Sequence, residues 1–478
     1  MSTATWPAIV DIATQVNSGE QKAADLVEKA LRIIEDKAEY QAIIAVTADR
    51  AREQARLIDS KVDAGENAGP LAGVPFIAKD NFLVFGAETT AASKILHGFN
   101  APYQSTAIEK LEAAGAVCVA KANMDAFAHG SSTENSDFMV TKNPVDKSRV
   151  PGGSSGGSAA AVVLEMAPFA LGTDTGGSIR LPASFCGAVG YKPTYGLVSR
   201  SGVVAMASST DVIGPMTRTV EDTAIVLSVM AGQDPLDSTT IDADPAGYTD
   251  LSGGVKGKKI GVIKEYMAEG ISPGVRKQVE NAVEKLRDGG AEIQEISLPT
   301  LPAALAVYYI VVPAEISSNL SRYDGQKYGY SAPDVATLDE SYKKTRSVGF
   351  GKEAKRRIMI GTYVLSSGYY DAYYKKAQTV RTKLINEFAD AFRRVDFLLG
   401  PVAPTTAFRI GENAEDPLQM YLTDIMTVAV NLAGIPAISI PAGVSDEDGL
   451  PVGLQLMAAQ RKDKELLTVA QATEELLQ

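Results

Sequence analysis

The feature that most constrains the fold of this 478-residue chain is a repeated order of helix, glycine and strand. Residues 105–114 carry apolar side chains at helical spacing, Gly115 is a helix stop, and residues 117–120 form an apolar run typical of a strand. The same order returns after a predicted strand at 259–263. A helix is predicted at 275–286, Gly289 and Gly290 end it, and a strand follows at 292–298. Helices that alternate with strands pack in layers, so the sequence predicts an α/β fold.

Two helical regions stand apart from this alternation. Residues 21–58 have apolar positions at helical spacing with charges between them, which predicts an N-terminal helical scaffold over about residues 1–65. A second, tyrosine-rich helical region spans about residues 300–395. After it, strand-like runs return at 395–399, 437–440 and 452–457. No low-complexity block or charge run marks a linker, so we predict a single domain, 1–478, with a helical excursion from its sheet.

Composition and charge exclude several classes of protein. The 46 basic and 58 acidic residues give a net charge of −12, which is the wrong sign for a protein that clamps nucleic acid through its phosphates. The two cysteines, Cys118 and Cys186, make neither a disulfide framework nor a metal cluster. The N-terminus lacks the features of a targeting signal, and the most apolar stretch, 425–443, is interrupted by Asn431 and two prolines. We therefore expect a soluble, cytoplasmic protein.

Two glycine-rich segments contain serines that are candidates for catalysis. Ser154 lies in Gly-Gly-Ser-Ser-Gly-Gly-Ser at 152–158, and Ser178 lies in Asp-Thr-Gly-Gly-Ser at 174–178. The first segment matches the Gly-x-Ser-x-Gly elbow of α/β-hydrolases, but that fold needs a histidine downstream of the serine. Both histidines of the chain, His97 and His129, precede every glycine-rich serine segment. The segment also lacks the lysine of a phosphate-binding loop, so neither of these interpretations is favoured.

Lys79, at the end of a predicted apolar strand over residues 74–78, is the base that remains. Burial would destabilise its ammonium and favour the neutral amine that accepts a proton. Ser154 would then be a proton relay and Ser178 a nucleophile. The backbone N–H groups of Thr175, Gly176, Gly177 and Ser178 would form an oxyanion hole at the start of the next helix, predicted over residues 179–185.

Each of these residues also has a purely structural interpretation. A lysine at a strand end is usually a solvated rim residue, and a serine in a glycine-rich turn is often a helix cap. Ser158 is such a candidate cap, for a helix over residues 158–164. Only the combination of the three segments favours catalysis.

That combination, with 75 residues from Lys79 to Ser154 and 24 from Ser154 to Ser178, resembles the amidase signature family. The resemblance implies a Ser–cis-Ser–Lys triad in which Ser178 is the nucleophile, Ser154 follows a cis peptide bond and Lys79 is the base. It also implies the family's fold, a large mixed β-sheet core covered by helices on both faces in an α/β/α arrangement.

Further blocks of sequence are similar to the glutaminase subunits of tRNA-dependent amidotransferases within that family. These blocks begin at Ala314, Lys355, Ser367 and Asn431. The similarity implies that Arg357 binds the α-carboxylate of glutamine and that Asp424 binds its α-ammonium, a pairing that matches the charges of a free amino acid. Tyr309, Gly130 and Ser131 are implied for the same pocket. Ala126 and His129 depart from the usual pattern, and we interpret His129 as a packed or surface residue.

The similarity further implies a place in a larger assembly. The chain would hydrolyse glutamine to glutamate and ammonia, and a partner B subunit would use the ammonia with ATP and Mg²⁺ to amidate Glu-tRNA(Gln), with Asp-tRNA(Asn) as a second candidate. A small C subunit would complete a heterotrimer, misacylated tRNA would be held mainly by the B subunit, and this chain would need no cofactor of its own. The alternatives are a free-standing amidase acting on other amides, and a non-catalytic structural subunit.

Overall fold

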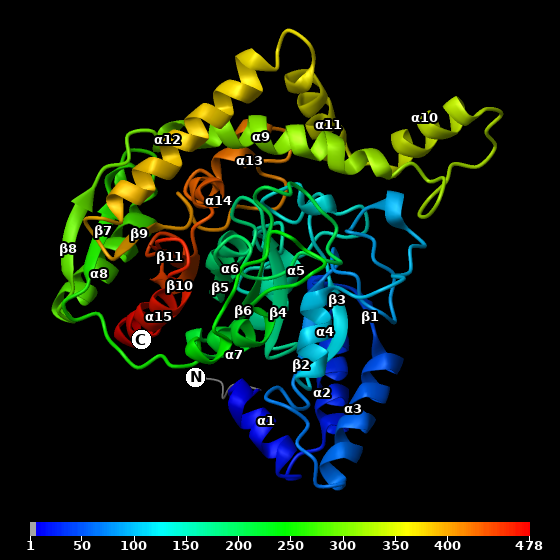
Figure 1. The fold of residues 1–478 in the computed structure, drawn as a ribbon, viewed down its shortest axis with the longest axis horizontal. Coiled ribbons are helices and arrows are strands. Elements are labelled where there is room, and N and C mark those ends of the chain that lie inside the picture. The colour runs from blue at the N-terminus through cyan, green and yellow to red at the C-terminus, as the bar shows by residue number, and fades with distance from the viewer. Residues whose placement is uncertain (1–5) are drawn as a thin grey trace.

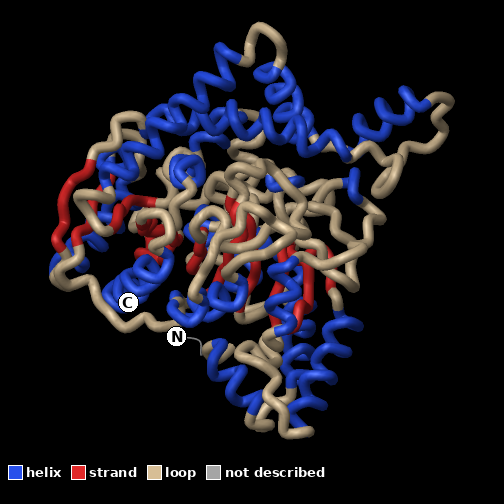
Figure 2. The backbone as a smooth tube through the Cα atoms, viewed as in Figure 1, coloured by secondary structure: helices blue, strands red, loops and turns tan. Residues whose placement is uncertain are grey.

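One mixed sheet of eleven strands runs through the molecule in the computed structural model, which describes residues 6–478 (Figures 1 and 2). The first five residues of the expected N-terminal scaffold lie outside the described part. The strands are β1 (Ile43–Val46), β2 (Pro75–Lys79), β3 (Val117–Ala122), β4 (Phe169–Asp174), β5 (Val189–Lys192), β6 (Val212–Thr217), β7 (Lys259–Ile263), β8 (Glu292–Ile296), β9 (Phe397–Pro401), β10 (Ala437–Val444) and β11 (Pro451–Ala458). Their spatial order is β1-β3-β2-β4-β6-β5-β10-β11-β9-β7-β8.

Parallel and antiparallel pairs both occur in this sheet. β2 is parallel to β3 and β4, and β7 is parallel to β8 and β9, whereas the remaining pairs are antiparallel. Every residue of β2, β4, β6, β9 and β11 is buried, so these strands are covered on both faces. The edge strands β1 and β8 are partly exposed. The predicted α/β fold with a large mixed sheet is confirmed.

Fifteen α-helices surround the sheet in the described part of the chain. They are α1 (Ile9–Asn17), α2 (Ala23–Asp36), α3 (Ala48–Asp63), α4 (Thr106–Ala113), α5 (Gly156–Val163), α6 (Arg180–Cys186), α7 (Val220–Met230), α8 (Pro273–Asp288), α9 (Ala304–Asn319), α10 (Leu338–Gly349), α11 (Lys352–Leu365), α12 (Lys376–Ala391), α13 (Pro417–Leu422), α14 (Val428–Ala433) and α15 (Asp463–Leu477). The described chain also contains short 3₁₀ turns and one π-helical turn, Asp371–Lys375.

The helical region predicted at about 300–395 corresponds to α9 through α12, which lie across the top of the molecule in Figure 1. Residues Leu301–Arg322, which include α9, are long and apolar enough to cross a membrane by length and composition, and half of the most apolar window is buried. α9 packs against α11, α12 and α14, so the contacts are those of a core helix.

Two local predictions differ from the structure. The segment 21–58 contains a four-residue strand, β1, between α2 and α3, where the sequence predicted only helices. Ser158 was expected to cap a helix, but it lies inside α5 and its Oγ donates a hydrogen bond of 2.9 Å to Leu171 O on β4. The capping prediction is wrong because the helix begins two residues earlier, at Gly156.

The sheet topology brings the candidate catalytic segments together. β2 ends at Lys79 and its parallel neighbour β4 ends at Asp174, and the carboxyl ends of parallel strands meet at one edge of a sheet. The segment containing Ser178 follows β4 directly, and α5 begins two residues after Ser154. The fold therefore places one candidate residue on each of three converging segments.

Candidate active site

Lys79 is fully buried, and its ammonium group is surrounded by hydroxyl groups. Its Nζ lies 2.8 Å from Ser154 Oγ, 2.9 Å from Ser155 Oγ and 2.9 Å from Thr173 Oγ1. Burial lowers the pKa of Lys79 to about 7, although the carboxylates of Asp125 and Asp174 act in the opposite direction. The neutral amine is therefore accessible near neutral pH. Sequence analysis missed Ser155, which is adjacent to Ser154, and Thr173, which directly precedes the segment that contains Ser178.

The peptide bond between Gly153 and Ser154 is cis, as the resemblance implied. Asp125, a buried carboxylate that sequence analysis missed, lies against this segment, and its backbone N–H donates to Ser154 O at 3.3 Å. A Cβ added to Gly153 would lie 2.2 Å from Asp125 Oδ2, so only glycine fits there. The carboxylate accepts backbone N–H groups from Thr133 and Asn135, yet burial raises the pKa of Asp125 to about 7.

Ser178 lies in the turn between β4 and α6, and it is 8% exposed. Its carbonyl oxygen accepts the N–H of Ser155 at 3.1 Å, so the two serine segments are in direct contact. Within residues 6–478, no hydrogen bond joins Ser154 Oγ to Ser178 Oγ, so the second half of the expected relay is not formed in this state. The N–H of Gly177 donates to Asp174 Oδ1 at 2.8 Å, whereas no partner is found in the described chain for the N–H groups of Gly176 and Ser178.

Arg180 holds this turn in place through several buried hydrogen bonds. Its guanidinium is fully buried and binds Asp174 Oδ1 at 2.9 Å, Asn431 Oδ1 at 2.6 Å and Gln455 Oε1 at 2.5 Å. The positive charge of Arg180 holds the pKa of Asp174 far below its ordinary value, against the opposing effect of burial. The hydrogen bonds from Arg180 to Asn431 and Gln455 therefore fix the turn to α14 and β11. Arg180 lies two residues after Ser178 in the sequence, but nothing in the local pattern identified its distant partners.

We call residues 175–178, which carry the candidate nucleophile Ser178, the nucleophile turn. Close neighbours of this turn come from α9 and from the segment before α14. A Cβ at Gly176 would lie 2.6 Å from the ring of Tyr308, and one at Gly177 would lie 2.2 Å from Thr427 Oγ1. Thr427 also donates a hydrogen bond of 2.5 Å to Gly176 O. Gly177 has a φ of 134°, a conformation that favours glycine. Both glycines are thus required by close contacts, and Gly177 also by its backbone conformation.

The candidate carboxylate-binding residue, Arg357, lies on α11 and is buried. Its Nε donates to Glu353 Oε1 at 2.8 Å, while its two terminal nitrogens have no hydrogen-bond partner in the described chain. Its Cζ lies 5.3 Å from the centre of the Tyr309 ring, which stacks on Tyr421 at 3.9 Å. Tyr309 Oη is buried and has no partner in residues 6–478. A cavity of about 130 Å³ lies beside this group and is lined in part by Gly130 and Arg357.

Asp424, the candidate ammonium-binding residue, is also enclosed and is 8% exposed. Its Oδ2 accepts a hydrogen bond of 2.6 Å from Ser131 Oγ, which joins two residues predicted for one pocket. Burial raises the pKa of Asp424 to about 7, although the Ser131 hydrogen bond and the charge of Arg357 lower it. The fold thus brings Ser131, Asp424 and the Arg357 group into one region next to the nucleophile turn. Sequence analysis missed Glu353 and Tyr421, which hold Arg357 in place.

His129 is fully buried, and neither ring nitrogen has a hydrogen-bond partner in the described structure. Its ring centre lies 6.1 Å from that of Phe127. Burial, together with the nearby charge of Arg357, lowers the pKa of His129 well below its ordinary value, so the ring is neutral. The interpretation of His129 as a packed residue is consistent with this burial.

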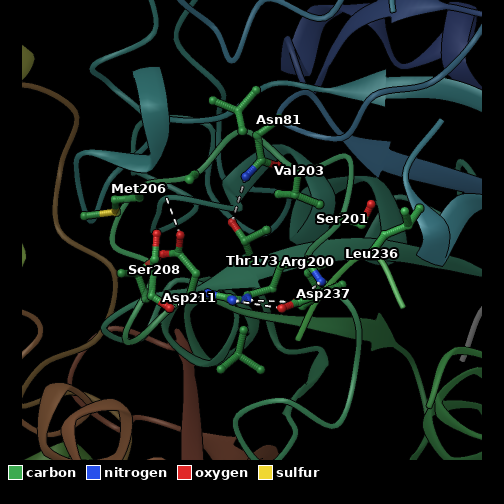
Figure 3. A pocket seen from close by; sticks show the side chains of 15 residues that line it. Asn81, Thr173, Arg200, Ser201, Val203, Met206, Ser208, Asp211, Leu236 and Asp237 are labelled. Atoms are coloured by element: carbon green, nitrogen blue, oxygen red, sulfur yellow. Dashed lines mark hydrogen bonds and ion pairs between the residues drawn. The ribbon is translucent and has the colours of Figure 1, made fainter. Parts of the chain in front are cut away.

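A second cavity, of about 220 Å³, is drawn in Figure 3 and is lined in part by Thr173, whose Oγ1 lies 2.9 Å from Lys79 Nζ. Asn81 and Thr173 approach each other on one side, joined by a hydrogen bond of 3.1 Å, and Arg200 pairs with Asp237 on the other. Asp211, which also lines the cavity, accepts a hydrogen bond of 2.7 Å from Thr175 of the nucleophile turn. Burial raises the pKa of Asp211 to about 6. No motif in the sequence indicated this cavity.

Comparison with known proteins identifies relatives across nearly the whole chain. A family model described as Amidase matches residues 25–467. The A subunit of glutamyl-tRNA(Gln) amidotransferase from Geobacillus thermodenitrificans is 52% identical over 469 residues, which cover 98% of this chain and 96% of that protein. The protein of the same name from Trichormus variabilis is 53% identical over 475 residues, with 98% and 97% covered.

Solved structures of amidases also match nearly the whole chain. The crystal structure of the A subunit of glutamyl-tRNA(Gln) amidotransferase from Thermotoga maritima matches with a TM-score of 0.79 at 40% identity, covering 97% of this chain and 94% of that one. Peptide amidase from Stenotrophomonas maltophilia matches with a TM-score of 0.83 at 29% identity, covering 98% and 97%. Both the length of the match and its identity are sufficient to assign the family. The chain therefore belongs to the amidase signature family of enzymes.

Proposed function

We propose that this protein is the glutaminase subunit of a tRNA-dependent amidotransferase and hydrolyses glutamine to glutamate and ammonia. The observation that carries the proposal is the pair of opposite charges next to the nucleophile turn. Arg357 presents two unpaired N–H-bearing nitrogens, and Asp424 presents a carboxylate, in the same enclosed region. A guanidinium fits a carboxylate and a carboxylate fits an ammonium, so the pair selects a free amino acid. The similarity to the A subunits of amidotransferases agrees with this substrate.

In the proposed reaction Lys79 begins as the neutral amine. Ser178 Oγ attacks the side-chain carbonyl carbon of glutamine while its proton passes to Ser154 Oγ, and the proton of Ser154 passes to Lys79 Nζ, 2.8 Å away. Rotation of the Ser178 hydroxyl toward Ser154 forms the missing hydrogen bond when substrate is bound. Ser154 then returns a proton to the departing ammonia, and a water molecule hydrolyses the acyl-enzyme by the same relay.

In the proposed reaction, backbone N–H groups of the nucleophile turn bind the developing oxyanion. Thr175, Gly176, Gly177 and Ser178 were all candidates, and we assign the main role to the N–H groups of Thr175, Gly176 and Ser178. Gly177 is left out because its N–H is already engaged by Asp174. Each such donor is typically worth about 2.7–4 kcal/mol in the transition state.

The proposal includes partner subunits. A B subunit would receive the ammonia and use ATP and Mg²⁺ to amidate Glu-tRNA(Gln), or Asp-tRNA(Asn), and a C subunit would complete a cytoplasmic heterotrimer. The net charge of −12 supports a division of labour in which the tRNA is bound mainly by another chain.

The test is ammonia release from glutamine by the assembled complex. Ser178→Ala should reduce the rate by at least about 10³-fold. Ser158→Ala is a matched control, because Ser158 is also a buried serine of a glycine-rich segment, but its Oγ donates to Leu171 O on β4. A Ser178→Ala complex that releases ammonia at the normal rate overturns the mechanism.

A second measurement separates this proposal from a free-standing amidase. Arg357→Ala should raise the KM for glutamine by about 10²-fold, since a charge-assisted contact is lost, while hydrolysis of a simple amide such as propionamide should change little. If wild-type protein prefers simple amides to glutamine and the KM is insensitive to Arg357→Ala, the free-standing amidase is the better description.

A further inference from the structure

Asp125 is a fully buried carboxylate that takes no part in the proposed proton relay. Its Oδ2 accepts the N–H of Thr133 at 2.9 Å, and its Oδ1 accepts the N–H of Asn135 at 3.1 Å. Within residues 6–478 it forms no ion pair. A buried charge without a basic partner destabilises a fold, so a carboxylate at this place needs a reason beyond the packing of the core.

The two hydrogen bonds fold residues 130–135, which we call the pocket loop, around Asp125. A Cβ added at Gly130 would lie 2.5 Å from Asp125 Cγ, so the loop closes tightly on the carboxylate. Thr133 has a φ of 66°, a left-handed conformation that is rare for a β-branched residue. Such a conformation persists only where its surroundings impose it, and the bond from the N–H of Thr133 to Asp125 is one of the contacts that do so.

Thr133 in turn holds both ends of the segment that contains Ser154. Its Oγ1 donates a hydrogen bond of 2.8 Å to Gly152 O and accepts the N–H of Gly156 at 3.1 Å. Between these two points, the backbone N–H of Asp125 donates to Ser154 O at 3.3 Å. The position of the proposed relay hydroxyl therefore depends on Asp125 and on the pocket loop.

The start of the same loop belongs to the proposed glutamine pocket. Ser131 Oγ donates a hydrogen bond of 2.6 Å to Asp424 Oδ2, and Gly130 and Arg357 line the same cavity. Contacts for proton transfer and contacts for substrate binding thus meet in one short loop that is folded around one carboxylate.

We propose that Asp125 is a positioning residue of the glutaminase. It folds the pocket loop so that Thr133 holds the segment of the relay serine and Ser131 holds the carboxylate of Asp424. The inference rests on the proposed function, because it assigns roles within that reaction. Asp125 exchanges no proton with the substrate; it acts on kcat through Thr133 and on KM through Ser131.

The experiment compares kcat and KM for glutamine in single variants of the assembled complex. Asp125→Asn should lower kcat and raise KM, each by at least about tenfold, because its amide NH₂ would face a backbone N–H donor and the loop would open. Thr133→Val removes the hydroxyl but keeps the shape, so it should lower kcat by about tenfold with little change in KM, whereas Thr133→Ser should keep the wild-type kcat. Ser131→Ala should raise KM by about tenfold and leave kcat nearly unchanged.

A double variant shows whether Asp125 acts through the loop. Asp125→Asn combined with Thr133→Val should have the same kcat as Asp125→Asn alone, because the second change removes a contact that is already lost. Losses of kcat that multiply would show that the two residues act independently and would overturn the inference. Asp222→Asn is a matched control that should keep both constants, since Asp222 is also buried and accepts a backbone N–H, but it lies on α7 and binds Ile9 of α1.

Thermal unfolding, measured on the same variants, separates a positioning role from a purely structural one. If Asp125→Asn lowers the unfolding midpoint but keeps the wild-type kcat and KM, Asp125 only stabilises the fold and the inference is wrong. If Asp125→Asn does not fold, Thr133→Val decides the question, because a wild-type kcat in that variant overturns the inference.

Propionamide separates the inference from the function on which it rests. If the wild-type complex hydrolyses propionamide but not glutamine, the proposed function fails. In that case a loss of propionamide hydrolysis in Thr133→Val, with recovery in Thr133→Ser, still supports the role of the pocket loop in the relay. Equal rates of propionamide hydrolysis in the wild type and Thr133→Val would overturn that role as well.

Discussion

In the proposed mechanism, the buried amine of Lys79 sets the pH above which the proton relay can work. The pKa of Lys79 is lowered to about 7 by burial, so the amine is protonated below that pH and neutral above it. Since only the neutral amine accepts a proton, we expect kcat/KM for glutamine to rise with pH through about 7. Lys79→Arg should lower kcat by at least about 10³-fold at every pH, because a guanidinium does not lose its proton in this range. Stopped-time ammonia assays from pH 5 to 9 measure both effects, and a flat wild-type profile would contradict this assignment.

Asp424 should add a second titration to the same profile. Burial raises its pKa to about 7, so the carboxylate that is to bind an ammonium loses its charge as the pH falls. Two groups, Lys79 and Asp424, must then lose a proton before the wild type can work. In a plot of the logarithm of kcat/KM against pH, we therefore expect a slope of two well below pH 7 for the wild type and a slope of one for Asp424→Asn. The variant should also have a raised KM at pH 8. Equal slopes in the two proteins would remove Asp424 from substrate binding.

The proposed triad and glutamine-binding residues could be named from the sequence because the blocks that carry them resemble the amidase signature family; local pattern alone left a structural interpretation open for each of them. Ser155, Thr173 and Asp125 could not, because their roles follow from segments that meet only in the folded chain. The same is true of Glu353, which lies four residues from Arg357 and resembles, in the sequence, part of a solvated, charged helix face.

The turn from β4 into α6 depends on a buried ion pair. Removing one partner of such a pair typically costs about 3–5 kcal/mol, because the other charge is left in a medium that solvates it poorly. We expect Arg180→Met to lower the free energy of unfolding by this amount, as measured by urea titration. Arg287→Ala, which removes an exposed pair with Glu284, should leave it nearly unchanged. Similar urea midpoints for both variants would show that the buried pair is not needed.

Elements were predicted best where the local pattern agreed with the final packing. The helices and strands around Gly115 and Gly289 lie within a few residues of their predicted bounds, because glycine stops and apolar periodicity are local signals. The four-residue strand β1 was missed, since it is too short to show alternation and is defined by its pairing with β3. The eleven-strand order could not be predicted at all, because pairs such as β5 with β10 join segments about 245 residues apart.

The N-terminal helices are tied to the rest of the protein through the only tryptophan of the chain. Trp6 is 1% exposed, its indole N–H donates to Glu165 O, and the N–H of Ile9 donates to the buried carboxylate of Asp222. If residues 1–478 are one domain, as we propose, unfolding by urea should give the same midpoint by tryptophan fluorescence and by far-ultraviolet circular dichroism. An earlier transition in fluorescence would show that the N-terminal scaffold unfolds separately.

The bonds from Arg180 to Asn431 and Gln455 have a consequence for protein synthesis. A growing chain that has left the ribosome as far as β9 already contains Lys79, Ser154 and Ser178, but it lacks the two amides that hold the turn beneath Ser178. It also lacks Asp424, and β10 and β11 have not yet joined the two halves of the sheet. Under the proposed mechanism, we therefore expect amide hydrolysis to begin only when translation is almost complete, so that unfinished chains would not consume glutamine.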